Sequence, residues 1–148
     1  MPSFGSCVIH CVWSTKNREP CLIPDLRERL WPYPGGIAKQ NQMKTLAIGG
    51  AADHVHILLL LPATLSVAKA MQLLKGNSSK WIRETFPKMR PFAWQEGYGA
   101  FSVGISGVDA TVTYINNQTE HHRKRSFREE FIAMLQKHGF EYEESMLV

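Results

Sequence analysis

The sequence predicts an α+β fold: a ferredoxin-like βαββαβ unit, in which an antiparallel sheet carries helices on one face, followed by two C-terminal helices. Two observations predict it. Strand and helix signals follow one another in the order strand, helix, strand, strand, helix, strand, and two further helical segments come after them. The chain also has 148 residues and no repeat or interdomain linker, which suits one domain over residues 1–148.

Short runs of β-branched, aromatic and small residues predict the strands. They lie at 4–14, 44–50 and 54–61, and a fourth strand region is expected at 92–94 and 99–103. The turn residues Gly49, Gly50 and Asp53 separate the second run from the third. These two runs are therefore expected to form a hairpin.

Capping residues and prolines mark the ends of the predicted helices. A first helix begins at Asp25, should break or kink over residues 32–36, which hold two prolines and two glycines, and resumes at 37–42. A long helix follows Ser66, which suits an N-cap, and ends near Pro87. The last two helices are expected at 109–122 and 127–138.

The composition is that of a globular protein. Hydrophobic residues make up 44% and charged residues 20%, and no apolar run approaches the roughly 20 residues of a membrane span. No signal peptide is recognisable, so we expect a cytoplasmic protein. Three cysteines without a Cys-x-x-Cys pair argue against a disulfide framework or a zinc site. The net charge of +4 and the pI of about 9.1 are compatible with a nucleic-acid partner.

The first chemical motif is His54-Val55-His56 at the start of the third predicted strand. Residues two apart in a strand point to the same face, so both imidazoles should project together. Two neighbouring imidazoles can chelate a divalent metal. His-x-His alone is a weak signal, and on spacing alone the two histidines could also merely sit at the start of a strand without a metal.

The second motif is Tyr114-Ile115-Asn116-Asn117-Gln118. On a helix, Tyr114 and Gln118 are one turn apart on the same face. The opposite stripe is apolar and is assigned to the core; it consists of Val108, Val112, Ile115 and Thr119. The helix would therefore pack through this stripe and present Tyr114 and Gln118 elsewhere.

The two motifs make chemical sense together. A tyrosine hydroxyl is a poor nucleophile, since its reference pKa is near 10. A metal held by His54, His56 and Gln118 could polarise a DNA phosphate, and Tyr114 could then attack the phosphorus. A phenolate leaves more readily than an alkoxide, so a DNA 3′-hydroxyl can reverse the covalent step without ATP. Mg²⁺ or Mn²⁺ fits such a site best.

These motifs resemble those of the single-strand HUH-type tyrosine transposases of the insertion sequence 200-like group, including its REP-associated branch. His-x-His with Tyr-x-x-x-Gln at this separation is the most specific part of the resemblance. The resemblance spans nearly the whole chain in order, through the segments 13–16, 49–56, 74–79, 94–102, 114–122 and 127–130. The proline-rich segment 32–34 departs from it, because an uninterrupted helix is expected there.

The resemblance implies roles for four residues. His54 and His56 would be metal ligands, Gln118 the third ligand, and Tyr114 the nucleophile. It further implies a 5′-phosphotyrosine intermediate on single-stranded DNA, DNA ends folded into hairpins, and a homodimer. The protein would thus be a metal-dependent DNA transposase that acts as a single-strand endonuclease and joins the ends again.

Basic side chains that could hold DNA phosphates are spread over three regions. They are Lys16 and Arg18 after the first strand, Lys75, Lys80 and Arg83 on the long helix, and His121, Arg123, Lys124 and Arg125 after the tyrosine. Trp81, Trp94 and Tyr98 could stack on unpaired bases, or pack in the core.

Two other functions remain open at this stage. A ferredoxin-like sheet with basic edges also suits a non-catalytic module that binds single-stranded nucleic acid. A metal-dependent hydrolase could use His54 and His56 with water as the nucleophile. A covalent protein–DNA adduct would separate the transposase from both.

Overall fold

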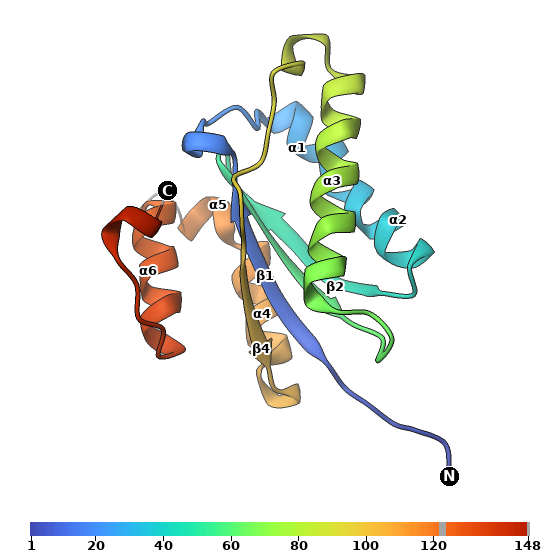
Figure 1. Ribbon diagram of the computed structural model, residues 1–148. Coiled ribbons are helices and arrows are strands. Elements are labelled where there is room, and N and C mark those ends of the chain that lie inside the picture. The colour runs from blue at the N-terminus through green and yellow to red at the C-terminus, as the bar shows by residue number, and fades with distance from the viewer. Residues whose placement is uncertain (122–123, 148) are drawn as a thin grey trace.

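The structure is a computed structural model that describes residues 1–121 and 124–147 (Figure 1). Four antiparallel strands form one sheet in the order β2-β3-β1-β4. The strands are β1 (Val8–Ser14), β2 (Lys44–Gly50), β3 (His54–Leu60) and β4 (Gly99–Val103). This order confirms the ferredoxin-like arrangement and the hairpin that pairs β2 with β3.

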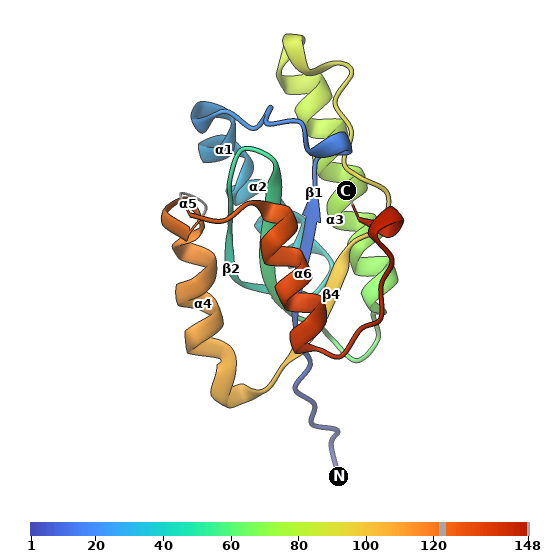
Figure 2. The same cartoon turned by 90° about the vertical axis from the view of Figure 1, so that its left-hand side faces the viewer.

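Helices cover both faces of the sheet (Figures 1 and 2). On one face lie α1 (Pro24–Leu30), α2 (Pro32–Gln40) and α3 (Val67–Thr85). On the other face lie α4 (Val108–Asn116), α5 (Gln118–His121) and α6 (Phe127–Lys137). Short 3₁₀ turns span Lys16–Arg18, Pro87–Met89, Ile105–Gly107 and Glu144–Met146. None of the helices in these described ranges has the length and apolar character that crossing a membrane requires.

The main core lies between the sheet and α1 to α3. Alternate residues of the two central strands point into it, including Cys11, Trp13, Val55, Ile57 and Leu59. The other face of the sheet carries two smaller apolar clusters. One joins Leu58 and Ala47 to α4, and the other joins Val12 and Phe101 to α6. The polar residues of the candidate site lie between these two clusters.

The proline-rich segment differs from the expectation. The break falls at Trp31, and α2 begins directly at Pro32 instead of resuming at residue 37. Proline fits the first turn of a helix, because no hydrogen bond to its nitrogen is needed there. Pro34 is buried within α2, so the segment contributes to the core as a helix.

The predicted strand and helix ends also need three corrections. The first strand begins at Val8 rather than at residue 4. Residues 92–94 form only an isolated bridge between Trp94 and Thr15. The helix predicted over 109–122 is divided at Asn117, whose φ of −102° and ψ of 20° leave the helical range. Tyr114 therefore lies in the last turn of α4, and Gln118 begins α5.

A row of residues across the sheet allows α4 and α6 to approach it closely. Gly49, His56, Val12 and Gly99 are aligned neighbours on the four strands. A Cβ at Gly49 would lie 2.4 Å from the carbonyl oxygen of Ile115 in α4. A Cβ at Gly99 would meet the ring of Phe131 in α6 at 2.7 Å. The absence of a side chain at these two positions thus sets the height of both helices above His56.

We predict that Gly49→Ala destabilises the fold, because α4 must move away from β2. Overpacking of this kind costs about 1–3 kcal/mol. The matched control is Gly36→Ala in α2, where a Cβ meets nothing within 4 Å and should raise stability by about 0.5–1 kcal/mol. Urea unfolding followed by circular dichroism measures both variants, and equal stabilities for the two would contradict the packing argument.

Candidate functional site

A short polar row lies on the face of the sheet beneath α4 and α6. His54 and His56 of β3 point to this face, as their spacing predicts, and both are fully buried. Their ring centroids are 5.1 Å apart. His10 of β1 lies beside them, with its ring centroid 5.0 Å from that of His56. Both imidazoles therefore lie on the face of the sheet away from the main core, and α4 and α6 cover that face.

His54 is held from both ring nitrogens. Its Nδ1 lies 2.7 Å from Oδ1 of Asp53, and its Nε2 lies 2.9 Å from Oε1 of Gln118. A neutral imidazole carries a proton on only one nitrogen. When Nδ1 donates to the Asp53 carboxylate, Nε2 presents a lone pair toward the amide oxygen. A carboxylate behind a histidine is the usual support of a metal-binding imidazole.

His56 has a similar arrangement with different partners. Its Nδ1 lies 2.8 Å from Nε2 of His10, and its Nε2 lies 2.8 Å from Oε1 of Glu130. Burial, with the nearby His56 as the next cause, lowers the pKa of His10 to about 3. His10 is therefore neutral at physiological pH and acts as a hydrogen-bonding support for His56.

Glu130, like His10 and Asp53, is not predicted for this site from the sequence. It comes from α6, is 1% exposed, and points toward the sheet. Its Oε1 faces His56, while its Oε2 accepts hydrogen bonds from the Tyr114 hydroxyl and from Nε2 of Gln118, the latter at 3.2 Å. One signal could have found it: Glu130 is three residues from Phe127, on the apolar stripe of α6.

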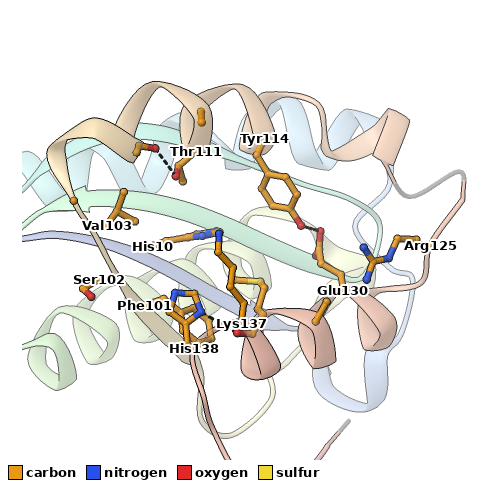
Figure 3. Close-up of a pocket in the computed structure, with 15 residues that line it drawn as sticks. His10, Phe101, Ser102, Val103, Thr111, Tyr114, Arg125, Glu130, Lys137 and His138 are labelled. Atoms are coloured by element: carbon orange, nitrogen blue, oxygen red, sulfur yellow. Dashed lines mark hydrogen bonds between the residues drawn. The ribbon is translucent and has the colours of Figure 1, made fainter.

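Tyr114 lies next to Glu130, with its hydroxyl directed to the carboxylate (Figure 3). It is half-buried, its hydroxyl donates to Glu130, and its ring centroid is 5.7 Å from that of His56. Burial and the neighbouring Glu130 carboxylate raise the pKa of Tyr114 above its ordinary value. The phenol is therefore protonated at neutral pH, with a carboxylate oxygen positioned to take its proton.

The donor atoms of this site fit a divalent cation. One ligand atom each from His54, His56 and Glu130 lies within 4.8 Å of the others. The amide oxygen of Gln118 lies 2.9 Å from Nε2 of His54 and adds a fourth donor. Lone pairs of nitrogen and oxygen thus face a common space, where a cation would be coordinated by them. Mn²⁺ binds readily to a set of two imidazoles with oxygen ligands, whereas Mg²⁺ prefers oxygen ligands alone.

The apolar stripe of the tyrosine helix packs largely as predicted. Val108, Val112 and Ile115 contact the cluster on the sheet, and Ile115 is fully buried. Thr119, assigned to the same stripe, is exposed instead. The reason is the break at Asn117, which changes the direction of the chain before Thr119.

The basic residues expected to hold DNA do not form one surface. Lys16 and Arg18 lie in the turn after β1. The ammonium group of Lys75 is bonded to the carbonyls of Gln95 and Gly97, which gives it a structural role. Lys80 and Arg83 are exposed on α3, on the other side of the sheet from Tyr114.

Of the basic residues predicted to hold DNA, Arg125 lines the same cavity as Tyr114 (Figure 3). Lys124 is exposed beside it. The side chain of His121 and all of Arg123 lie outside the described residues.

The aromatic residues considered for base stacking differ in exposure. Trp94 is buried and its Nε1 donates to Ser78 at 3.0 Å, so it packs in the core. Trp81 is half-buried and stacks on Tyr33. Tyr98 is exposed and can still meet a base.

Comparison with known proteins points to one family. A family model described as "Transposase IS200 like" matches residues 3–118. The chain is 29% identical over 121 residues to the transposase for insertion sequence element IS200 of Salmonella typhimurium, and the match covers 78% of each protein. It is 26% identical over 85 residues to the ISDra2 transposase TnpA of Deinococcus radiodurans, which covers 57% of this chain and 61% of that protein.

Two solved structures share the fold. A crystal structure of a candidate transposase from Deinococcus radiodurans R1 superposes with a TM-score of 0.67 at 25% identity, over 80% of this chain and 95% of that chain. The structure of a REP-associated tyrosine transposase bound to a REP hairpin superposes with a TM-score of 0.62 at 13% identity, over 82% and 74% of the two chains. At that identity the second likeness concerns the fold alone.

We predict that Mn²⁺ raises the melting temperature of the protein, because a ligand bound only by the native state stabilises it, by about 2.7 kcal/mol at 100 times Kd. Glu130→Gln keeps the size of the side chain but removes its charge, so most of the Mn²⁺-induced shift should disappear. The control is Glu129→Gln, an exposed neighbour on α6 with the same charge change. Thermal unfolding with and without Mn²⁺ measures the shift, and a full shift in Glu130→Gln would rule Glu130 out as a ligand.

Proposed function

The chain belongs to the family of IS200-like transposases, and we propose that it cleaves and rejoins single-stranded DNA through Tyr114 with the help of a divalent metal. One observation carries the proposal. The hydroxyl of the half-buried Tyr114 meets a buried cluster formed by the imidazoles of His54 and His56 and the carboxylate of Glu130. A nucleophile, a proton acceptor and a set of metal donors are thus assembled within a single chain.

Glu130 makes the phenol usable as a nucleophile. The pKa of Tyr114 is raised, so little phenolate exists in the resting protein. As the phenol oxygen bonds to phosphorus, its proton passes along the existing hydrogen bond to Oε2 of Glu130. The P–O3′ bond of the DNA breaks, and the leaving 3′ oxygen takes a proton from water. The products are a 5′-phosphotyrosine and a free 3′-hydroxyl.

The same residues serve the joining step in reverse. A 3′-hydroxyl attacks the phosphotyrosine and gives its proton to water. The phenol oxygen leaves, and Glu130 returns the proton to it. The helical turn that carries Tyr114 holds the phenol oxygen in place through both steps, which contributes to the rate by positioning.

His54, His56 and Gln118, together with Glu130, would hold the metal. A divalent cation at these donors supplies a Lewis acid that polarises the phosphate and stabilises its developing charge. Asp53 and His10 orient the two imidazoles from behind, and Gln118 is fixed through its bond to Glu130. Mg²⁺ and Mn²⁺ are the proposed ions.

The proposed DNA contacts start from the exposed basic residues near Tyr114, which are Lys124 and Arg125, with His121 and Arg123 in the same segment. Lys16, Arg18, Lys80 and Arg83 would contact more distant parts of a folded DNA end. Lys75 is a weaker candidate for a phosphate contact, because two carbonyls already occupy its ammonium group.

We predict that wild-type protein incubated with Mn²⁺ and single-stranded DNA forms a covalent adduct, and that Tyr114→Phe forms none. The phenylalanine ring keeps the packing, so the variant should fold normally and still bind DNA. Denaturing electrophoresis measures the adduct and peptide mass mapping locates it. The control is Tyr98→Phe, an exposed tyrosine outside the site, which should retain the adduct.

The outcome separates the three candidate functions. DNA attached to a residue other than Tyr114 would contradict the assigned nucleophile. Cleavage without any adduct would favour the metal-dependent hydrolase. Binding without cleavage by the metal-loaded wild type would favour the non-catalytic binding module.

We also propose that the protein acts as a homodimer with twofold symmetry. Each chain carries a complete set of site residues, since Tyr114 faces its own His56 and Glu130. We expect light scattering at micromolar concentration to give twice the monomer mass. A monomeric protein that forms the adduct at the same rate would refute the dimer without affecting the nucleophile.

A further inference from the structure

A groove runs between α4 and α6 and ends at Tyr114 (Figure 3). Its volume is about 560 Å³, within the roughly 300–1,000 Å³ of ligand-sized sites. We call it the α4–α6 groove. Residues of α4 and α6 line its sides, and His10 of β1 and Phe101 of β4 also line it.

Small residues keep this groove open. Helix α4 presents Ala110 and Thr111 to it, and α6 presents Ala133. The two helices rest on separate apolar clusters of the sheet, one beneath each helix. The two helices therefore stand far enough apart to leave the groove between them.

One end of the groove is aromatic. The imidazole of His138 lies over the ring of Phe101, with centroids 4.5 Å apart, and its Nδ1 lies 2.8 Å from the carbonyl oxygen of Met134. His138 is exposed on its other side. A flat, fixed and accessible ring of this kind suits stacking against a nucleobase.

The charge of the groove suits an anionic chain. Arg125 lies at the end near Tyr114, and Lys137 extends from α6 across the groove toward His10 (Figure 3). Lys137 is exposed, and no ion pair among the described residues involves it. Glu130 is the one carboxylate among the residues that line the groove, and it is directed to the histidines and Tyr114.

We propose that the α4–α6 groove holds the stretch of single-stranded DNA next to the scissile phosphate, with Lys137 on a neighbouring phosphate and His138 against an unpaired base. The proposal rests on the proposed function, because the groove leads the strand to the phenol oxygen of Tyr114. A base can stack on His138 only when it is unpaired, so the site would select an unpaired strand. Lys137 and His138 thus become positioning residues for the reaction.

The test compares Lys137→Gln with Lys39→Gln. Lys39 is a matched control, since it is also an exposed lysine in the last turn of a helix, but on the opposite face of the sheet. Adduct formation by metal-loaded protein at low concentrations of a single-stranded oligonucleotide should fall about tenfold in Lys137→Gln only. The slope of log affinity against log salt should also become shallower by about 0.7, the value for one phosphate contact on a single strand.

Truncated oligonucleotides make the test specific to the groove. After the cleavage position is mapped with wild-type protein, nucleotides are removed from one flank of the scissile phosphate and then from the other. Removal of the flank that occupies the groove should erase the difference between wild type and Lys137→Gln. If the difference persists whichever flank is removed, Lys137 acts elsewhere and the proposal fails.

A steric variant tests the groove independently of charge. Ala110→Trp places a large ring in the groove, whereas Thr113→Trp adds the same ring at an exposed position of α4 outside the lining. Only Ala110→Trp should slow adduct formation. Equal rates of adduct formation for both tryptophan variants, or for both lysine variants, would contradict the proposal that the groove holds the DNA strand. They would leave the covalent adduct at Tyr114 unaffected. If wild-type protein formed no adduct on any single strand, the proposed function would fall instead.

Discussion

The carboxylate of Glu130 is the interaction on which the arrangement of the site depends. It is buried on α6 and links three elements that are distant in the chain: His56 on β3, Tyr114 on α4 and Gln118 on α5. A buried carboxylate is costly unless it is hydrogen-bonded and its charge is compensated. The hydrogen bonds are provided by the protein. A cation at the histidines would provide the compensating charge, so metal binding and the packing of α6 are expected to depend on each other.

The electrostatics of the site also explain how one residue can serve two purposes. Oε1 of Glu130 faces the histidine nitrogens and Oε2 faces the phenol. Its negative charge and the burial of Tyr114 raise the pKa of that phenol and keep it protonated. Positive charge brought to Oε1 would weaken the effect of the carboxylate on Tyr114. Tyr114 is therefore held in an unreactive state in the isolated protein, which would suit the proposed covalent step, since that step should occur only on loaded substrate.

The parts of the site that could be predicted from the sequence are the local ones. The two-residue period of a strand places His54 and His56 on one face, and one helical turn brings Gln118 near Tyr114, even though Asn117 interrupts the helix. Strand order likewise follows from short hairpins and crossovers. Glu130 could not be placed in this way, since its role depends on how α6 packs across the sheet. A glutamate on an amphipathic helix is far more often solvated than buried.

The same limit explains why the groove is visible only in the structure. A groove between two helices depends on their separation, and that separation is set by contacts at their bases. Ile115 of α4 rests against the backbone of Gly49, and Phe131 of α6 packs where Gly99 has no side chain. The two glycines lie on opposite sides of His56 in one row of the sheet. The two glycines that bring both helices close to the candidate metal donors therefore also leave the α4–α6 groove above the central β-strands. A DNA strand that reaches Tyr114 would have to pass through that groove.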